Sequence, residues 1–173
     1  QEPFLNPFKF SAFQLEYLSI INLKDIIMEK RIQIDAVEPL AFKALFGLEK
    51  YLQQSPLDKI HYELIKIRAS QINGCSFCLN MHTKDALALG EDPTRIFLLD
   101  AWWETDLFSE EEKVILKATE EVTLVHKNGL STETYQKATK LFNENYISQI
   151  IMAIVTINAW NRIAISTHKP IQK

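Results

Sequence analysis

The amino-acid sequence predicts an all-α protein, a compact bundle of six or seven helices. Glycine is scarce, with 4 among 173 residues, and no stretch long enough for a strand alternates apolar and polar residues between turn residues. Helix-start and helix-stop residues, by contrast, recur along the chain. Because neither an internal repeat nor a linker separates the expected helices, we predict a single helical bundle.

The expected helix boundaries come from capping side chains, prolines at first helical positions and glycines that follow a last turn. Ser55 before Pro56 predicts the start of one helix, and Gly74 predicts the end of the same helix. Ser109, followed three residues later by Glu112, is typical of a capping box. Together these signals predict helices over residues 37–51, 55–71, 75–89, 93–103, 109–127, 131–143 and 147–166.

The chain is expected to hold one domain preceded by an N-terminal extension. A chain of 173 residues is long enough for one sizeable core and too short for two independent ones. Residues 1–27 differ from the rest because they combine prolines with closely spaced aromatic residues, and residues 15–27 could form an amphipathic helix. We therefore expect an N-terminal arm at residues 1–27 and a helical domain at residues 28–173.

Charge and hydropathy exclude two classes of partner. The net charge is -3 and the basic residues are scattered, so no nucleic-acid partner is expected. The most apolar stretch, residues 147–166, is interrupted by polar residues that include Asn158, Asn161 and Arg162. Such a stretch is typical of a core helix and not of a membrane span, so no membrane partner is expected.

The cysteines and the N-terminal sequence predict a cytoplasmic protein. No basic region followed by an apolar stretch and a cleavage site is visible, so no secretory signal is expected. Cys75 and Cys78 are the 2 cysteines of the chain. A bridge between them would close so small a loop that it would barely restrict the unfolded chain. A structural disulfide is therefore not expected, which favours a reducing compartment.

Chemistry is predicted for the segment that contains both cysteines and His82. In a helix, residues three and four positions apart share one face, so Cys75, Cys78 and His82 are expected along a single edge. The positive end of the helix, the neighbouring sulfur and a nearby imidazole all favour the thiolate, which is the nucleophilic form of cysteine. His82 follows Cys78 by one turn and could accept its proton directly or through a water.

Glu63 is the expected proton partner of His82. It lies in the preceding helix, at the border of an apolar stripe that contains Leu64 and Ile67. From this border the carboxyl group could reach a half-buried site and exchange protons with His82. Periodicity alone does not single out Glu63, because most carboxylates on helices are solvated.

A zinc site is the main alternative for the cysteines. The segment offers three local ligands, and a fourth would have to come from His61, His126 or His168, so neither a metal nor another cofactor is expected. These three histidines are instead interpreted as packing or buried polar groups. The same interpretation applies to the Trp102–Trp103 pair and to Asn158, Asn161 and Arg162.

The sequence also resembles a known family. Glu63, eleven intervening residues, the run Cys75-Ser-Phe-Cys78 and then His82 are similar to the alkylhydroperoxidase D-like (AhpD-like) branch of the carboxymuconolactone decarboxylase superfamily. The similarity runs from about Lys30 to Pro170. It implies an AhpD-like all-helical fold that assembles as dimers, trimers or hexamers. It also implies that Cys75 and Cys78 form a redox pair and that Glu63 and His82 relay protons.

The sequence departs from this pattern between the cysteines. The best-studied peroxidase of the family has a histidine there, and this chain has Phe77, so the resemblance leaves the reductant and the peroxidase rate open. The lactone decarboxylases of the superfamily act without the cysteine pair, so their reaction is not expected here.

The expected function is that of a thiol-dependent antioxidant enzyme, a peroxiredoxin-type alkylhydroperoxidase. In this hypothesis the Cys78 thiolate attacks a hydroperoxide, Cys75 resolves the sulfenic acid into a disulfide, and an external dithiol of the lipoyl or thioredoxin type restores the thiols. Two alternatives remain open. One is a general dithiol-disulfide exchanger or redox sensor with little peroxidase activity, and the other is a zinc-stabilised interaction module.

A homo-oligomer is expected from the apolar load of the chain. Phe97, Phe108 and the Trp102–Trp103 pair add large apolar surfaces to the periodic core positions, and the aromatic arm at residues 1–27 adds more. A closed symmetric assembly would cover such surfaces. We predict a homodimer or a hexamer built from dimers, with the arm crossing between subunits.

Overall fold

The computed structural model describes residues 29–171, and within them the chain is helical and contains no strand, which confirms the all-α prediction. The α-helices in this part of the chain are α2 (Ile34–Val37), α3 (Pro39–Gln54), α4 (Lys59–Asn73), α5 (Ser76–Ala88), α6 (Pro93–Leu98), α7 (Glu110–Thr123), α8 (Thr132–Leu141) and α9 (Glu144–Ser166). Two 3-10 helices are added, η2 (Leu99–Glu104) and η3 (Val125–Lys127). The arm expected at residues 1–27 lies outside the described residues.

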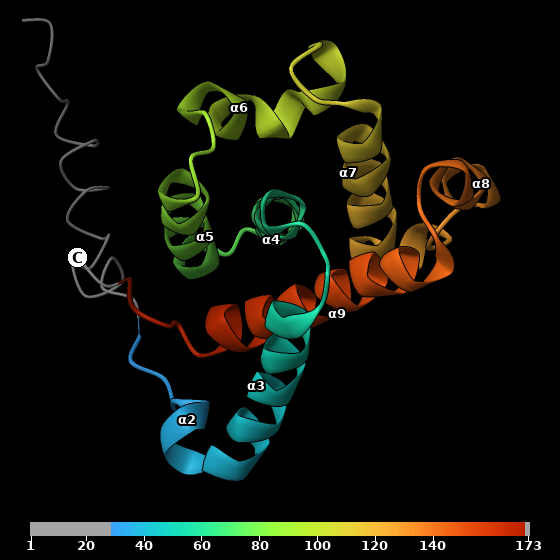
Figure 1. The fold of residues 1–173 in the computed structure, drawn as a ribbon. Helices are drawn as coiled ribbons and strands as arrows, with labels where there is room; N and C mark the ends of the chain where they lie inside the picture. The colour runs from blue at the N-terminus through green and yellow to red at the C-terminus, as the bar shows by residue number, and fades with distance from the viewer. Residues whose placement is uncertain (1–28, 172–173) are drawn as a thin grey trace, which may run out of the picture. The chain divides into compact units, whose positions relative to one another are not determined.

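Helix α4 lies at the centre of the bundle. Figure 1 looks along its axis, and α5, α7 and α9 contact it from different sides. Ile65 and Ala69 belong to a core cluster with α9, whereas Leu64 and Ile67 belong to a second cluster with α5, α6 and α7. As a result, every residue from 63 to 70 is buried, including the charged ones.

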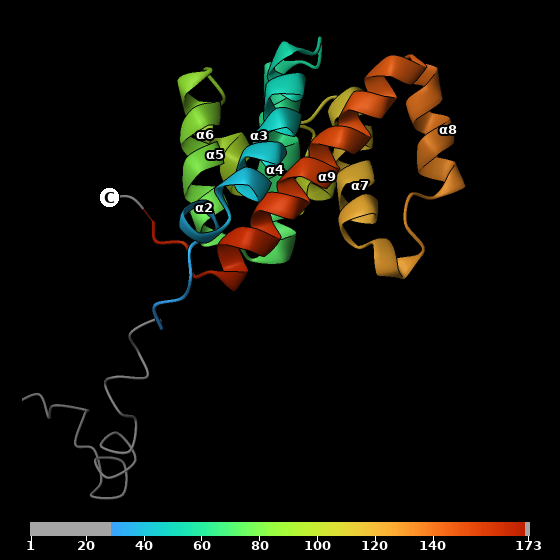
Figure 2. The same ribbon diagram turned by 90° about the horizontal axis from the view of Figure 1, so that it is seen from below.

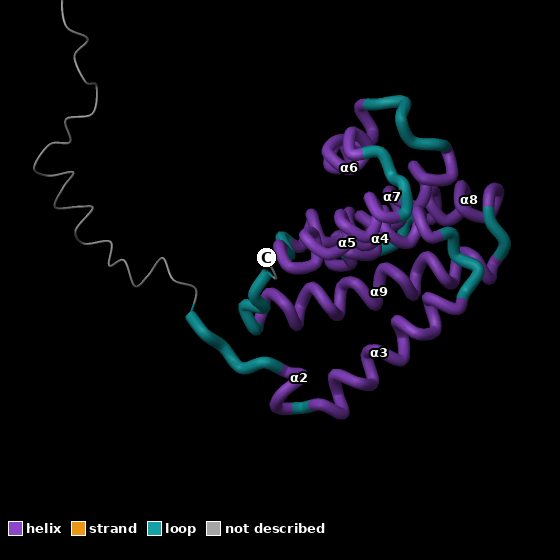
Figure 3. The backbone as a smooth tube through the Cα atoms, turned by 60° about the vertical axis from the view of Figure 1, so that its left-hand side comes forward, coloured by secondary structure: helices purple, strands orange, loops and turns teal. Residues whose placement is uncertain are grey.

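Helix α9 is the longest helix in the described part of the chain, and α3, α4, α5, α7 and α8 pack against it. Figure 3 shows α3 along one side of α9, with α4 and α5 along the other. In Figure 2, α7 and α8 gather at the N-terminal part of α9, where Val114, Ala138 and Ile147 form a small core cluster. None of the helices within residues 29–171 is long and apolar enough to cross a membrane.

The start of α4 differs from the prediction based on Ser55 and Pro56. The N-cap is Asp58, whose Oδ1 accepts from the N–H groups of Ile60 at 2.8 Å and His61 at 3.1 Å. The Ser55 hydroxyl instead donates to the carbonyl of the last turn of α3, at 2.7 Å. The prediction of a helix start at residue 55 was therefore wrong, because Asp58 was available as a second capping residue three positions later.

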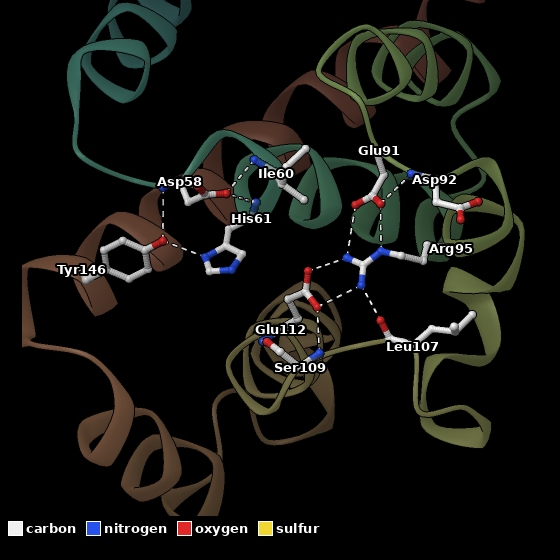
Figure 4. Close-up of polar contacts among 10 residues, drawn as sticks. All are labelled: Asp58, Ile60, His61, Glu91, Asp92, Arg95, Leu107, Ser109, Glu112 and Tyr146. Carbon is white, nitrogen blue, oxygen red and sulfur yellow. Dashed lines mark hydrogen bonds and ion pairs between the residues drawn. The ribbon is translucent and has the colours of Figure 1, made fainter.

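Tyr146 of α9 fixes this start of α4 from the side, as Figure 4 shows. Its hydroxyl oxygen accepts from the backbone N–H of Asp58 at 3.1 Å and lies 2.7 Å from Nδ1 of His61. His61 is thus engaged in a structural contact, in keeping with its interpretation as a polar packing residue.

Two of the expected helices are shorter than predicted. The helix expected at residues 93–103 ends at Leu98 and continues as η2, in which Ala101 leaves helical geometry with φ -122° and ψ 31°. The helix expected at residues 109–127 ends at Thr123, although its capping box between Ser109 and Glu112 is present as predicted. In both cases the chain tightens into 3-10 geometry at a helix end, where this geometry is common.

The last two helices also shift at their ends. Helix α8 ends at Leu141, because Asn143 caps the next helix through a bond from the N–H of Tyr146 at 2.9 Å. Helix α9 therefore begins three residues before the predicted residue 147. The shift follows from capping chemistry, since an asparagine that accepts from an N–H group three positions ahead begins a helix.

Of the large apolar residues expected on the surface, some are buried in the core and others are exposed. Trp102 and Phe108 are buried in the core cluster of α4, α6 and α7. Phe97 is 80% exposed and Trp103 is 55% exposed. Only part of the apolar load identified in the sequence is therefore left uncovered within one chain.

Arg95 joins α6 to α7 through two carboxylates. Its Nε atom donates to Glu91 at 2.8 Å, and its Nη2 atom donates to Glu112 (Figure 4). Glu112 is also part of the capping box of α7, because it accepts from the N–H of Ser109 at 2.8 Å. One guanidinium therefore neutralises two carboxylates that the core has largely removed from water.

We predict that Arg95→Met lowers the free energy of unfolding by about 3 kcal/mol, because it leaves two mostly buried carboxylates without a cation. Urea unfolding monitored by circular dichroism would measure the change. The matched control is Lys137→Met, which removes an ion pair with Glu133 that is exposed and is expected to change stability little. Equal losses in the two variants would contradict this interpretation.

Candidate active site

The site is built at the turn between α4 and α5. Gly74 adopts a left-handed conformation with φ 70°, and this reverses the chain direction directly after α4. The N–H of Cys75 then donates to the carbonyl of Ser70 at 2.9 Å, closing the end of α4. Because any other L-residue is strained at such a φ, the Asn73-Gly74 signal in the sequence located this turn correctly.

The two cysteines occupy the first turn of α5. Cys75 is its N-cap, and its sulfur accepts from the N–H of Cys78 at 3.4 Å. The two Sγ atoms lie 2.8 Å apart, both thiols are free, and both residues are almost completely buried. The structure thus places a reduced dithiol at the positive end of a helix.

The two thiols of this pair differ in acidity. The hydrogen bond from the Cys78 thiol lowers the pKa of Cys75 to about 7, although burial opposes this shift. The same hydrogen bond raises the pKa of Cys78, and burial raises it further. Because the Cys78 thiol donates to the Cys75 sulfur, ionisation of Cys75 keeps Cys78 protonated.

His82 and Glu63 form a buried pair next to the dithiol. The Nδ1 atom of His82 lies 2.9 Å from Oε2 of Glu63, and both side chains are at most 8% exposed. Glu63 comes from α4 and His82 from α5, so the packing of these helices brings together the two residues that the sequence analysis selected. The contact at Nδ1 leaves Nε2 as the imidazole nitrogen that can exchange a proton elsewhere.

A cavity of about 340 Å³ lies over this site, between α3, α4, α5 and α9. Its apolar wall includes Phe42, Phe46, Tyr62, Phe77 and Trp160. Its polar lining includes Glu63, Lys66, Cys78, His82 and Asp85. Of the two cysteines, Cys78 lines the cavity, whereas Cys75 is the one whose pKa is lowered.

The sequence analysis missed a second polar cluster at this cavity, centred on Glu49 of α3. Its Oε1 atom accepts from Trp160 Nε1 at 2.8 Å, Lys66 donates to both oxygens at 2.9 and 3.1 Å, and the Tyr62 hydroxyl donates to Oε2. No spacing rule links Glu49 with Lys66, because they belong to different helices. The one local signal was a lysine four residues after Tyr62 on the same helix face.

Asparagines of α4 and α9 support the cysteine turn from behind. Asn73 Nδ2 donates to the side chains of Asn158 at 3.0 Å and Asn161 at 2.8 Å. Asn161 donates to Ser70 Oγ at 3.0 Å, and its side chain also favours the thiolate form of both cysteines. Asn158 and Asn161 are buried polar support, as interpreted from the sequence, and together with Asn73 they fix the position of the turn.

The group of possible metal ligands in the structure differs from the ligands that the zinc alternative requires. Within residues 29–171, the side chains that could hold a metal ion are Glu63, His82 and Asp85, whose ligand atoms lie within 4.8 Å of one another. This group contains neither cysteine. Glu63 and His82 already bond to each other, so the group has a structural explanation without an ion.

Comparisons with known proteins give a consistent family. Residues 39–121 match the model of the carboxymuconolactone decarboxylase family. The uncharacterized protein YdfG of Bacillus subtilis (strain 168) is 40% identical over 139 residues, which covers 80% of this chain and 95% of that protein.

Solved structures share the fold. A protein of unknown function from Agrobacterium tumefaciens, proposed to be an antioxidant defence protein AhpD, has a TM-score of 0.81 and 35% identity, covering 84% of this chain and 99% of its own. The debrominase Bmp8 has a TM-score of 0.67 at 17% identity, covering 75% of this chain and 69% of its own. The second likeness concerns the fold alone, so the reaction has to be argued from the site.

We predict that the reduced protein titrates one thiolate with a midpoint near pH 7, the value of the lowered pKa of Cys75. Ultraviolet absorbance of the thiolate would follow the titration, and Cys78→Ser should raise the midpoint because it removes the thiol donor. Since folding lowers the pKa of Cys75 from 9.0 to about 7, this group stabilises the reduced protein increasingly between these two pH values, and the contribution is lost as pH falls below 7. A midpoint at the ordinary thiol value would contradict the lowered pKa of Cys75.

Proposed function

We propose, since this chain belongs to the AhpD-like branch of the carboxymuconolactone decarboxylase superfamily, that it is a thiol-dependent peroxidase of the alkylhydroperoxidase type. One observation carries the proposal. Two free thiols lie 2.8 Å apart beside a cavity whose lining includes Cys78 and the Glu63–His82 pair. A nucleophile, a resolving thiol and a proton carrier are thus available to one bound molecule.

The first step would take place at Cys78, because this cysteine lines the cavity. His82 accepts the thiol proton through its free nitrogen, while Glu63 holds the imidazole in place. The Cys78 thiolate then attacks the terminal oxygen of a hydroperoxide, an S–O bond forms and the O–O bond breaks. The leaving alkoxide takes the proton back from His82, so the products are an alcohol and a sulfenic acid.

The second step would use Cys75, which is already in contact with Cys78. Its sulfur attacks the sulfenic acid, the S–S bond forms and water leaves with the thiol proton. No large movement is required, because the sulfurs need to approach from 2.8 Å to a bond length of about 2.05 Å.

An external dithiol would complete the cycle by reducing the disulfide while becoming a disulfide itself. Both cysteines are at most 2% exposed, so a reductant has to reach them through the cavity. This burial favours a slender dithiol of the lipoyl type over direct contact with a thioredoxin-type protein.

A second function, general dithiol-disulfide exchange, is favoured by a different observation. The N-terminal cysteine of the pair has the lowered pKa and caps a helix, an arrangement typical of exchange proteins. Peroxide consumption with and without a dithiol separates the two functions, because an exchanger would reduce disulfides without consuming peroxide.

We further propose a cytoplasmic homodimer or a hexamer built from dimers. Leu40, Phe46 and Tyr51 of α3 and Phe97 of α6 remain exposed within one chain. A symmetric assembly would cover such side chains.

We predict that peroxide removes two titratable thiols from the reduced protein, since one sulfur is oxidised and the other closes the disulfide. Thiol titration before and after treatment would count them. In Cys75→Ser the sulfenic acid should persist and react with a dimedone probe, whereas Cys78→Ser should react slowly with peroxide. An unchanged thiol count in the wild-type protein would rule out the cycle.

We predict that His82→Ala or Glu63→Gln slows oxidation by peroxide about a hundredfold, because each variant removes a member of the proton relay. Stopped-flow measurement of the oxidation rate would test this. Asp85→Asn is the matched control, because Asp85 is more distant from His82 Nδ1 at 3.8 Å and is half exposed. Wild-type rates in both relay variants would remove the support for the relay.

A further inference from the structure

Lys66 is a buried cation in the wall of the cavity. Its residue is 3% exposed, its Nζ atom lies 2.9 and 3.1 Å from the oxygens of Glu49, and it also lies 3.9 Å from the centre of the Tyr62 ring. An ammonium has three N–H donors, and Glu49 accounts for two contacts. Glu49 and Tyr62 therefore hold the ammonium in place, and Lys66 remains part of the cavity lining.

Glu49 keeps this cation in place as an ionised partner. Burial acts to raise the pKa of Glu49, but the charge of Lys66 and the hydrogen bonds from Tyr62, Lys66 and Trp160 outweigh it and hold the pKa below its ordinary value. A buried ion pair of this kind is seldom needed for stability, since apolar residues of similar volume often serve as well. Because Lys66 lines the same cavity as Cys78, we look for its role in the chemistry of that cavity.

A thiolate at Cys78 is unfavourable, and the positive charge of Lys66 opposes this effect. Cys78 lines the cavity, yet its hydrogen bond to Cys75 and its burial both raise its pKa. The charge of Lys66 acts in the opposite direction on Cys78. Lys66 and Cys78 come from different helices, α4 and α5, and line the same cavity.

We infer that Lys66, fixed by Glu49 and Tyr62, is a positioning residue that makes negative charge on Cys78, the sulfur that lines the cavity, less unfavourable. This inference rests on the proposed function, because it assigns the ammonium a role in preparing the attacking thiolate. The Cys78 proton passes to His82, as in the proposed function, while Lys66 stays protonated and compensates the negative charge left on the sulfur. No oxidant or reductant is involved in this step.

Other charged and titratable groups face the same cavity and are retained in every variant except Glu49→Gln. They are Glu49 from α3, Tyr62 and Glu63 from α4, His82 and Asp85 from α5, and Lys169 after α9. Glu63 and Asp85 would disfavour a thiolate by repulsion, whereas Lys66 and Lys169 would favour it. Lys66 differs from Lys169 in that it is buried and therefore less screened by solvent.

The experiment measures the thiolate of Cys78 without any peroxide. In a Cys75→Ser background, the single remaining thiol is titrated by ultraviolet absorbance and by its rate of alkylation with iodoacetamide. Lys66→Met should raise the midpoint by about one pH unit, at the lower end of the effect of a nearby opposite charge. The alkylation rate below the midpoint should fall about tenfold, as the thiolate fraction falls.

Two further variants separate an electrostatic effect from structural damage. Glu49→Gln removes the anion and leaves the ammonium, so the midpoint of Cys78 should move in the opposite direction. The double variant Glu49→Gln/Lys66→Met removes both charges and avoids an unpaired carboxylate if the single variant does not fold; its midpoint should lie above that of the Cys75→Ser protein. In a Cys78→Ser background, Lys66→Met should shift the Cys75 midpoint less.

An unchanged Cys78 midpoint in folded Lys66→Met protein would overturn the inference, and so would shifts of the same sign in Lys66→Met and Glu49→Gln. These outcomes are independent of peroxidase activity. A protein that shows the expected shifts but consumes no peroxide would refute the proposed function and leave the electrostatic role of Lys66 intact.

Discussion

The burial of residues 63–70, the central part of α4, is the constraint on which the rest of the structure depends. A helix packed on all sides cannot direct charged side chains to water, and an unpaired charge in such a position is costly. Each charged residue of its buried stretch therefore pairs with a different neighbouring helix. The pairs are Glu63 with His82 of α5, Lys66 with Glu49 of α3, and Arg68 with Glu120 of α7.

Two of these three pairs also line the cavity. The need to pair the buried charges of α4 therefore also supplies the charged side chains of the site. In the proposed function the Glu63–His82 pair carries protons at this cavity, and the Lys66–Glu49 pair gives the same cavity a fixed cation. The apolar wall from α3 and α9 limits access of water, which strengthens both electrostatic effects. The chemistry of the site and the packing of the helices therefore cannot be varied independently.

Local signals in the sequence predicted the parts of the fold that local interactions control. The Asn73-Gly74 turn, the capping box at Ser109 and the helical position of the cysteines all depend on residues within one turn of each other. Where two local signals competed, as at Ser55 and Asp58, the sequence did not indicate which would cap the helix. The arm at residues 1–27 is outside the described part of the chain, and its expected role remains a proposal.

The sequence by itself determined the dithiol, because the spacing of Cys75, Cys78 and His82 along one helix makes their proximity a matter of helical geometry. It also indicated Glu63, although only the resemblance to a family selected that residue over other carboxylates. Only the tertiary structure decided that Glu49 and Lys66 belong to the site and that Cys78 lines the cavity. Such contacts join helices far apart in the chain, and the side chains that meet there depend on how whole helices pack, which no local pattern of residues specifies.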